Sequence, residues 1–438
     1  MTTLAERLPD APPAAARTDE AELAARGGER AVIRLLTLSL AFNIFGMRLG
    51  LPLSTSGVPL LLPVVYGVVI YLRLRGELVL SAHRTMGYLA AMAACTFAAY
   101  LSFARGRSDT SFTSLMLLVA TYAPFCFGLR PDRKALFNRV LGRFVTLTTV
   151  LAWLAVGQIA LQLAGWKYSD LLGSVVPHSF LLQNFNTSYP VQYGASLYKA
   201  NGFFCLEPSY CSQYLALGLV AYIVRGAHWR KVVLYILAIL ATVSGTGLLL
   251  LAGAMVVVSV RRGPRFAASV VLLVGIVALA ISFTPAAAPF KKRLTETSSS
   301  QSSGSLRFVQ PYSRMWDELG KDPASVAFGE GSGFADRDAT TFFEDTGLPL
   351  NYAMIPKLVI EYGVVGCLIF LIFLYSAFTR GSPSTELSGA TIVFVTILSG
   401  SLLSPTVMYT PLVLIVWFAH DRDAGVDRSS ILAHPPAA

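Results

Sequence analysis

Apolar residues occur along the chain in runs long enough to cross a bilayer, separated by polar connections. A membrane-spanning helix needs about 20 predominantly apolar residues. The pattern predicts twelve such helices, at about 31–49, 57–73, 84–104, 111–129, 139–164, 208–225, 231–243, 245–260, 266–284, 351–378, 387–403 and 404–419. The seventh and eighth runs are short and nearly continuous, so they form either two short helices or one broken re-entrant pair.

Basic residues fall in alternate connections, and cytoplasmic connections of membrane proteins carry an excess of Lys and Arg. This bias places both termini in the cytoplasm. Arg105 and Arg107 then lie outside, against the bias, so they are either misplaced by the helix count or functional cations. Two long segments, 165–207 and 285–350, are also placed outside. The clusters that set the orientation are Arg73/Arg75/Arg84, Arg130/Arg133/Lys134/Arg139, Arg225/Arg230/Lys231, Arg261/Arg262/Arg265 and Arg380.

The composition agrees with a membrane protein. The chain has 438 residues, of which 54% are hydrophobic and only 14% charged, whereas soluble domains are about a quarter charged. The net charge of +10 does not indicate nucleic acid, because most basic residues lie in short clusters between apolar runs. The prediction is an all-α polytopic membrane protein with a disordered cytoplasmic tail (1–30), a membrane domain of about twelve helices (31–420) and a second cytoplasmic tail (421–438).

The second outer segment is uneven in charge. Lysine and arginine predominate in its first part, and aspartate and glutamate predominate in the part that follows. Cations outside the membrane suggest an anionic ligand, and arginine suits phosphate because it offers a planar fork of donors. The alternative is a solvated loop, or one that touches anionic headgroups. Arg314 lies between Tyr312 and Trp316, which can order it. The other cations of the segment are Lys291, Lys292, Arg293 and Arg307.

Glu207 directly precedes Pro208 at the expected start of the sixth helix. Proline is favoured at the first helical position, and a carboxylate is favoured at a helix N-terminus by the dipole. Glu207 is therefore either a helix cap or a carboxylate placed to take a proton from a sugar hydroxyl.

Two further patterns carry candidate binding residues. Glycines at 329, 331 and 333 form either a plain turn or a backbone that approaches a ligand closely. Lys357 and Glu361 are four residues apart, so they share a helix face and form either a structural ion pair or a site facing a cavity. The sequence contains no readable serine–histidine–acid set and no convincing acidic metal site, so we expect a reaction without metal or cofactor.

Four segments, in order, resemble motifs of the O-antigen ligase/polymerase superfamily, in particular the Wzy-type bacterial polysaccharide polymerases. They cover roughly residues 195–370, and the resemblance extends to the whole chain by topology. The segments are Phe203-Phe-Cys-Leu-Glu-Pro-Ser (family FxxEPS), Ser244-Gly-Thr-Gly, Arg314 with Gly329-Glu-Gly-Ser-Gly, and Asn351 to Gly366 (family N…ExGxxG).

The resemblance implies a GT-C-like membrane glycosyltransferase of the bacterial inner membrane. Its substrate would be an oligosaccharide linked to undecaprenyl pyrophosphate, used on the periplasmic face beside membrane lipids and a chain-length-regulating co-polymerase. Arg314 would be the signature arginine, and Lys199 would replace an arginine that many relatives carry before FxxEPS. We take Arg314 and Glu207 as candidate catalytic residues. The candidate substrate-binding residues are Lys199, Arg307, Tyr312, Gly329, Gly331, Asn351 and Lys357.

Three alternatives to a polymerase remain at this stage. A ligase would transfer finished glycan to a lipid or protein acceptor, but that branch typically has a histidine shortly before the Asn351 helix, and none occurs between Gly333 and Asn351. A flippase or transporter would need charges at mid-membrane and internal symmetry. A scaffold protein would turn over no lipid-linked substrate.

Overall fold

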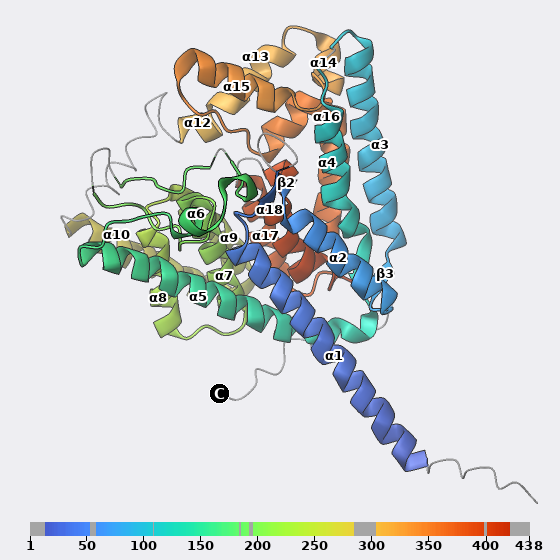
Figure 1. Ribbon diagram of the computed structural model, residues 1–438, viewed down its shortest axis with the longest axis vertical. Helices are drawn as coiled ribbons and strands as arrows, with labels where there is room; N and C mark the ends of the chain where they lie inside the picture. The colour runs from blue at the N-terminus through green and yellow to red at the C-terminus, as the bar shows by residue number, and fades with distance from the viewer. Residues whose placement is uncertain are drawn as a thin grey trace, which may run out of the picture.

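The structure is a computed structural model that describes residues 14–52, 58–107, 109–183, 185–191, 196–283, 304–397 and 401–420. Within these residues the chain is mostly helical, with two short two-stranded antiparallel sheets. Figure 1 shows a bundle of long helices with a layer of short helices, α12 to α15, over one end.

Each apolar run predicted from the sequence coincides with a helix. Four helical segments in the described part of the chain have both the length and the hydropathy of membrane spans: Ala82–Ala104, Pro131–Leu163, Gly245–Arg262 and Met354–Thr379. The helices of the bundle are α1 (Ala14–Phe45), α2 (Leu61–Leu74), α3 (Ala82–Ala104), α4 (Phe112–Tyr122) with η1 (Ala123–Cys126), η2 (Pro131–Leu136) with α5 (Phe137–Leu163), α7 (Pro208–Val224), α8 (Trp229–Ala241), α9 (Gly245–Arg262), α10 (Pro264–Phe283), α16 (Met354–Thr379), α17 (Thr385–Ile397) and α18 (Pro405–Pro411) with η7 (Leu412–Val416).

The core of the bundle lies along α7 and α16. Helix α16 packs along α3, and α7 packs against α5 and α9. All residues of α7 from Pro208 to Ala221 are buried, so this helix is enclosed by its neighbours. By contrast, large apolar side chains such as Trp153, Leu368 and Ile372 are well exposed on outer faces. Such faces are stable in lipid, which accepts apolar surface but no unpaired backbone groups.

The first outer segment is tied to the end of α1. Arg48 donates from Nη1 and Nη2 to the two carboxylate oxygens of Asp170, at 2.6 and 2.5 Å. Asp170 also caps the short helix α6 (Leu171–Val175) by accepting from the amide of Gly173. The rest of this segment holds η3 (His178–Phe180), and β1 (Gly50–Leu51) pairs with β2 (Val58–Pro59) beside it.

The described part of the second outer segment folds into four short helices over the ends of α3 and α16 (Figure 1). They are α12 (Ser305–Phe308), α13 (Gln310–Leu319), α14 (Pro323–Phe328) and α15 (Phe334–Thr346). The predicted basic cluster Lys291, Lys292 and Arg293 lies outside the described residues.

The N-terminal tail differs from its prediction. Helix α1 begins at Ala14, whereas the sequence predicted a disordered tail over 1–30. The segment 14–30 is rich in alanine, glutamate and arginine, which are strong helix formers, so the first helix extends toward the N-terminus. Residues 1–13 and the predicted tail 421–438 lie outside the described residues.

Candidate functional site

A tight turn in front of Glu207 fixes the start of α7. Phe203 has φ of 66°, a region that residues other than glycine rarely adopt. Its amide donates to Asn201 Oδ1 at 3.0 Å, and Gln158 Oε1 accepts from the amides of Asn201 and Gly202 at 3.1 and 2.9 Å. Because Gln158 is fully buried in α5, the turn is anchored to the bundle.

Glu207 stands at the N-cap position of α7, but its side chain makes no capping hydrogen bond. The hydroxyl of Ser209 instead donates to Glu207 Oε2 at 3.0 Å, and Arg307 Nη2 lies 3.5 Å from the same oxygen. The side chains of Arg307 and Glu207 are 17% and 19% exposed. The pair therefore joins the two outer segments and remains accessible to a ligand.

Arg314 forms a bidentate pair with Asp338. Nε donates to Oδ2 at 2.8 Å, and Nη2 donates to Oδ1. The Tyr352 hydroxyl donates to Oδ2 at 2.6 Å, and the guanidinium carbon lies 5.3 Å from the centre of the Phe342 ring. Arg314 is still 31% exposed, whereas Asp338 is 6% exposed. The arginine is thus held in place from behind and open on one side.

This pairing shifts the pKa values of both partners. The hydrogen bonds to Asp338 raise the pKa of Arg314 further above its usual value, against the opposing effect of burial. Burial would raise the pKa of Asp338, but the hydrogen bonds from Arg314 and Tyr352 outweigh it and hold that pKa below its usual value. Both groups are therefore charged at neutral pH.

Lys357 and Glu361 share one face of α16, as their spacing predicts, with Nζ 3.6 Å from Oε1. Nζ also donates to Asp336 Oδ1, at 2.6 Å. Glu361 is fully buried, and within the described residues neither of its carboxylate oxygens has a hydrogen bond of standard geometry. The Lys357 contacts connect the entry of α16 to α15, the helix that also carries Asp338.

The glycine-rich loop before α15 packs on a break in α16. Gly363 has φ of 69° and ψ of 178°, which interrupts the helix. The carbonyls near this break accept from the loop: Ile360 O from the Glu330 amide at 2.8 Å, and Glu361 O from the Gly331 amide at 3.1 Å. A Cβ on Gly329 would lie 2.5 Å from the Glu361 carbonyl carbon. Gly329 and Gly331, which the sequence suggested for substrate binding, are here used for close approach of two backbones.

Arg105 and Arg107, the cations that break the charge bias, both pair with acids of the second outer segment. Arg105 Nη2 lies 2.9 Å from Asp322 Oδ2, and Arg107 Nη2 lies 2.8 Å from Glu330 Oε2. Glu330 is 1% exposed, so Arg107 neutralises a buried carboxylate. These pairs give the two arginines a structural reason to lie at this end of α3.

The other predicted residues have local contacts. Lys199 is buried, with Nζ 4.9 Å from the centre of the Tyr189 ring. The side-chain Nδ2 of Asn351 donates to Pro349 O at 3.3 Å, and the backbone N–H of Asn351 donates to Leu306 O. Tyr312 packs against the core, and burial raises its pKa.

The described contacts therefore join Arg307 with Glu207, Arg314 with Asp338, and Lys357 with Asp336, and they do not join Arg314 to Glu207. Sequence reasoning missed Asp336 and Asp338 as partners. The only indication of these two partners in the sequence is the series of acidic residues that follows the cations of the second outer segment. In the described part of the chain, no group of three or more His, Cys, Asp or Glu side chains could hold a metal ion.

The described helices are apolar enough for a membrane protein, and charged, partly exposed side chains gather at one end of the bundle. Residues 38–421 match the family model of the WcaD colanic acid polymerases, so the chain belongs to this family. This confirms the resemblance to Wzy-type polysaccharide polymerases and supports polymerisation of polysaccharide repeat units by a glycosyltransferase-type membrane enzyme. No curated protein and no solved structure matches the chain.

Proposed function

We propose that this protein polymerises oligosaccharide repeat units, linked to undecaprenyl pyrophosphate, into a cell-surface polysaccharide at the periplasmic face of the bacterial inner membrane. Membership of the polymerase family supports the reaction class. The proposed enzyme crosses the membrane about twelve times, keeps both termini in the cytoplasm and has a GT-C-like architecture. We include a chain-length-regulating co-polymerase among its partners.

The contact between Glu207 and Arg307 carries the proposed site. In the reaction, a hydroxyl of the acceptor sugar attacks the anomeric carbon of the donor glycan from the side opposite the leaving group. The bond from that carbon to the pyrophosphate oxygen breaks, with inversion. Glu207 takes the hydroxyl proton, and the lipid pyrophosphate leaves with the bonding electrons. No metal takes part in the proposed step.

Arg307 lies 3.5 Å from the proposed base, so its positive charge is next to the reacting hydroxyl. On this side it orients Glu207 toward the hydroxyl, because the two side chains are linked across the outer segments. The pyrophosphate leaves on the opposite face, where a different cation is needed.

Arg314 is proposed to hold the pyrophosphate of one lipid substrate. Two of its nitrogens are bound to Asp338, and the side chain is 31% exposed, which leaves Nη1 for one phosphate oxygen. Asp338 and Tyr352 keep the guanidinium in a single orientation, so little side-chain freedom is lost on binding. Lys199, Lys357, Tyr312 and Asn351 remain candidate binding residues, and Gly329 and Gly331 position the loop among them.

The test is incubation of the purified protein with lipid-linked repeat units, followed by gel separation of the products. We expect Glu207→Gln and Arg307→Gln each to reduce the rate of polymer formation by about 10²–10³-fold, with normal amounts of folded protein. Lys321→Gln is the matched control, because Lys321 lies in the same helical layer and is 64% exposed. Long products from both site variants at the parental rate would refute the proposed site, and transfer to an unrelated lipid or protein acceptor would indicate a ligase.

A further inference from the structure

The hydroxyl of Ser209 donates a hydrogen bond to the carboxylate of Glu207, with Oγ 3.0 Å from Oε2. The nearest nitrogen of Arg307, Nη2, lies 3.5 Å from the same carboxylate oxygen. Ser209 is 8% exposed, whereas the Glu207 side chain is 19% exposed. A buried hydroxyl therefore holds one oxygen of a carboxylate that a ligand can reach.

This hydrogen bond is unusual for a serine in the first turn of a helix. Serine side chains near a helix start commonly bond to backbone groups. Here the hydroxyl binds Glu207, whose own side chain makes no capping hydrogen bond to α7. A hydrogen bond to an ionised carboxylate is charge-assisted and stronger than a neutral one. The polar side chains at the start of α7 thus hold each other instead of capping the helix.

Ser209 is itself fixed by its neighbours in α7. Its carbonyl oxygen accepts from Ser212 Oγ at 2.9 Å and from Gln213 Nε2 at 3.4 Å. Both of these side chains are fully buried. Because the backbone of Ser209 is held in this way, its hydroxyl is a firm support for Glu207.

The start of α9 supports the same part of α7. The amide of Gly247 donates to Ser212 Oγ at 3.1 Å. A Cβ on Gly247 would lie 2.6 Å from the Cβ of Ser212, so the two helices approach as closely as a glycine permits. A series of hydrogen bonds therefore runs from the segment Ser244-Gly-Thr-Gly through Ser212 to the backbone of Ser209.

We propose that Ser209 is a positioning residue for the polymerisation reaction and acts through Glu207. Its hydroxyl and Arg307 hold Oε2, so Oε1 is the oxygen that takes the proton of the acceptor hydroxyl. A glutamate side chain has several rotatable bonds, and fixing its end before the substrate binds keeps the base in a productive geometry. This role rests on the proposed function, because it requires Glu207 to be the base.

The test is a double-mutant cycle on the polymerisation rate of the purified full-length protein with lipid-linked repeat units. Ser209→Ala should lower kcat about tenfold, because a hydrogen bond to a charged group is lost, and should leave KM unchanged. The double variant with Glu207→Gln should be no slower than Glu207→Gln alone, because a residue that acts through Glu207 then has no base to position.

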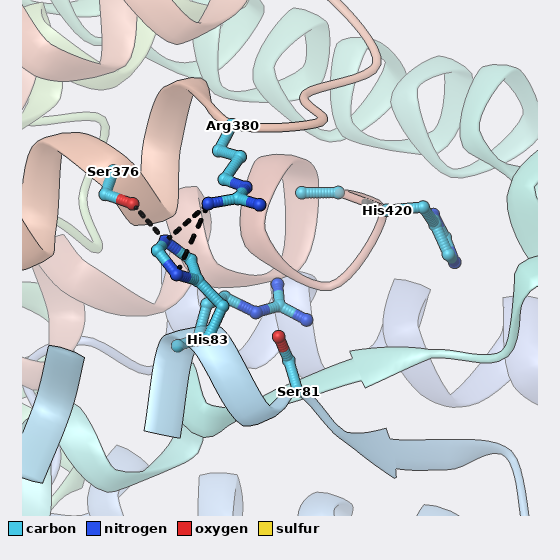
Figure 2. A pocket seen from close by; sticks show the side chains of 7 residues that line it. Ser81, His83, Ser376, Arg380 and His420 are labelled. Carbon is cyan, nitrogen blue, oxygen red and sulfur yellow. Dashed lines mark hydrogen bonds between the residues drawn. The ribbon is translucent and has the colours of Figure 1, made fainter. Parts of the chain in front are cut away.

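Ser376→Ala is the matched control. Ser376 also lies on a bundle helix and bonds to another side chain, with its Oγ 2.8 Å from His83 Nε2. Figure 2 shows this contact in a small pocket between the start of α3 and the end of α16. These are the ends of the two helices away from the α12–α15 layer, so Ser376→Ala should keep the parental kcat.

Two results would overturn the role of Ser209 and leave the proposed function intact. One is a parental kcat in Ser209→Ala while Glu207→Gln is slow. The other is a double variant slower than Glu207→Gln by the full factor of Ser209→Ala, since a purely structural residue would act independently of the base. A parental rate in Glu207→Gln would instead refute Glu207 as the base, and with it the role of Ser209.

Discussion

Asp338→Asn should release Arg314 from its support and destabilise the α12–α15 layer. The carboxylate accepts two hydrogen bonds from Arg314 and one from Tyr352. Asparagine keeps the shape but loses the charge and turns an NH₂ group toward these donors. A hydrogen bond to a charged group contributes about 1.5–3 kcal/mol. Water screens part of this, because Arg314 is 31% exposed, so we expect a net loss of about 2–3 kcal/mol in the free energy of unfolding.

The assay is thermal unfolding of the purified protein in detergent. For a chain of this size the expected loss lowers the midpoint by about 2–4 °C. Glu318→Gln is the control, because it removes an exposed ion pair with Lys321 and should cost less than about 1 kcal/mol. Polymer formation should also fall in Asp338→Asn, since Arg314 is no longer oriented.

The pH dependence gives an independent check. The pKa of Asp338 is lower in the folded protein than its usual value, so its contribution to stability is present above the unfolded pKa of about 4 and is lost as the pH falls through the folded pKa. The loss of stability at low pH that comes from protonation of Asp338 should be absent in Asp338→Asn. A double-mutant cycle with Arg314→Gln that gives no coupling energy would refute the proposed support of Arg314 by Asp338.

Three other predictions follow from the described contacts. Gly363→Ala should strongly reduce the yield of folded protein, measured by size-exclusion chromatography, because its Cβ would lie 2.2 Å from the carbonyl oxygen of Ala327 in α14; a normal elution profile would contradict the close packing of α14 on α16. Glu330→Gln should cost about 1 kcal/mol of stability in thermal unfolding, because it breaks the 2.8 Å pair with Arg107 but leaves an arginine that is 45% exposed and can be hydrated; a loss of several kcal/mol would contradict this weak coupling. The Arg48 hydrogen bonds lower the pKa of Asp170, so its carboxylate stays charged and keeps α6 in place until the pH falls below about 4. Protease cleavage near α6 should therefore increase only below that pH. The variant Asp170→Asn should be cleaved readily at neutral pH as well.

The helices were predictable because lipid selects long apolar runs, and these runs are visible in the sequence without any knowledge of tertiary contacts. The ion pair of Lys357 and Glu361 was predictable for a similar reason, since four residues make about one helical turn. Both features are local or periodic, and both appear in the structure as expected.

The partners of the cations could not be predicted in the same way. Arg314 and Asp338 are 24 residues apart, and they lie on two short helices whose sequences do not specify how they pack. The contact of Arg307 with Glu207 likewise depends on how the two outer segments fold together. The sequence showed that cations and acids were present, but only tertiary packing determines which cation meets which acid.

The loop from Gly329 to Gly331 is attached to α16 through its own main-chain amides, at the carbonyls of Ile360 and Glu361. A Cβ at Gly329 or at Gly331 would lie only 2.5 Å from a neighbouring atom, and both residues have positive φ. The attachment therefore depends on the absence of side chains at these two positions. A change in the residues that face a substrate must come from other positions of the α12–α15 layer, while this main-chain contact stays fixed.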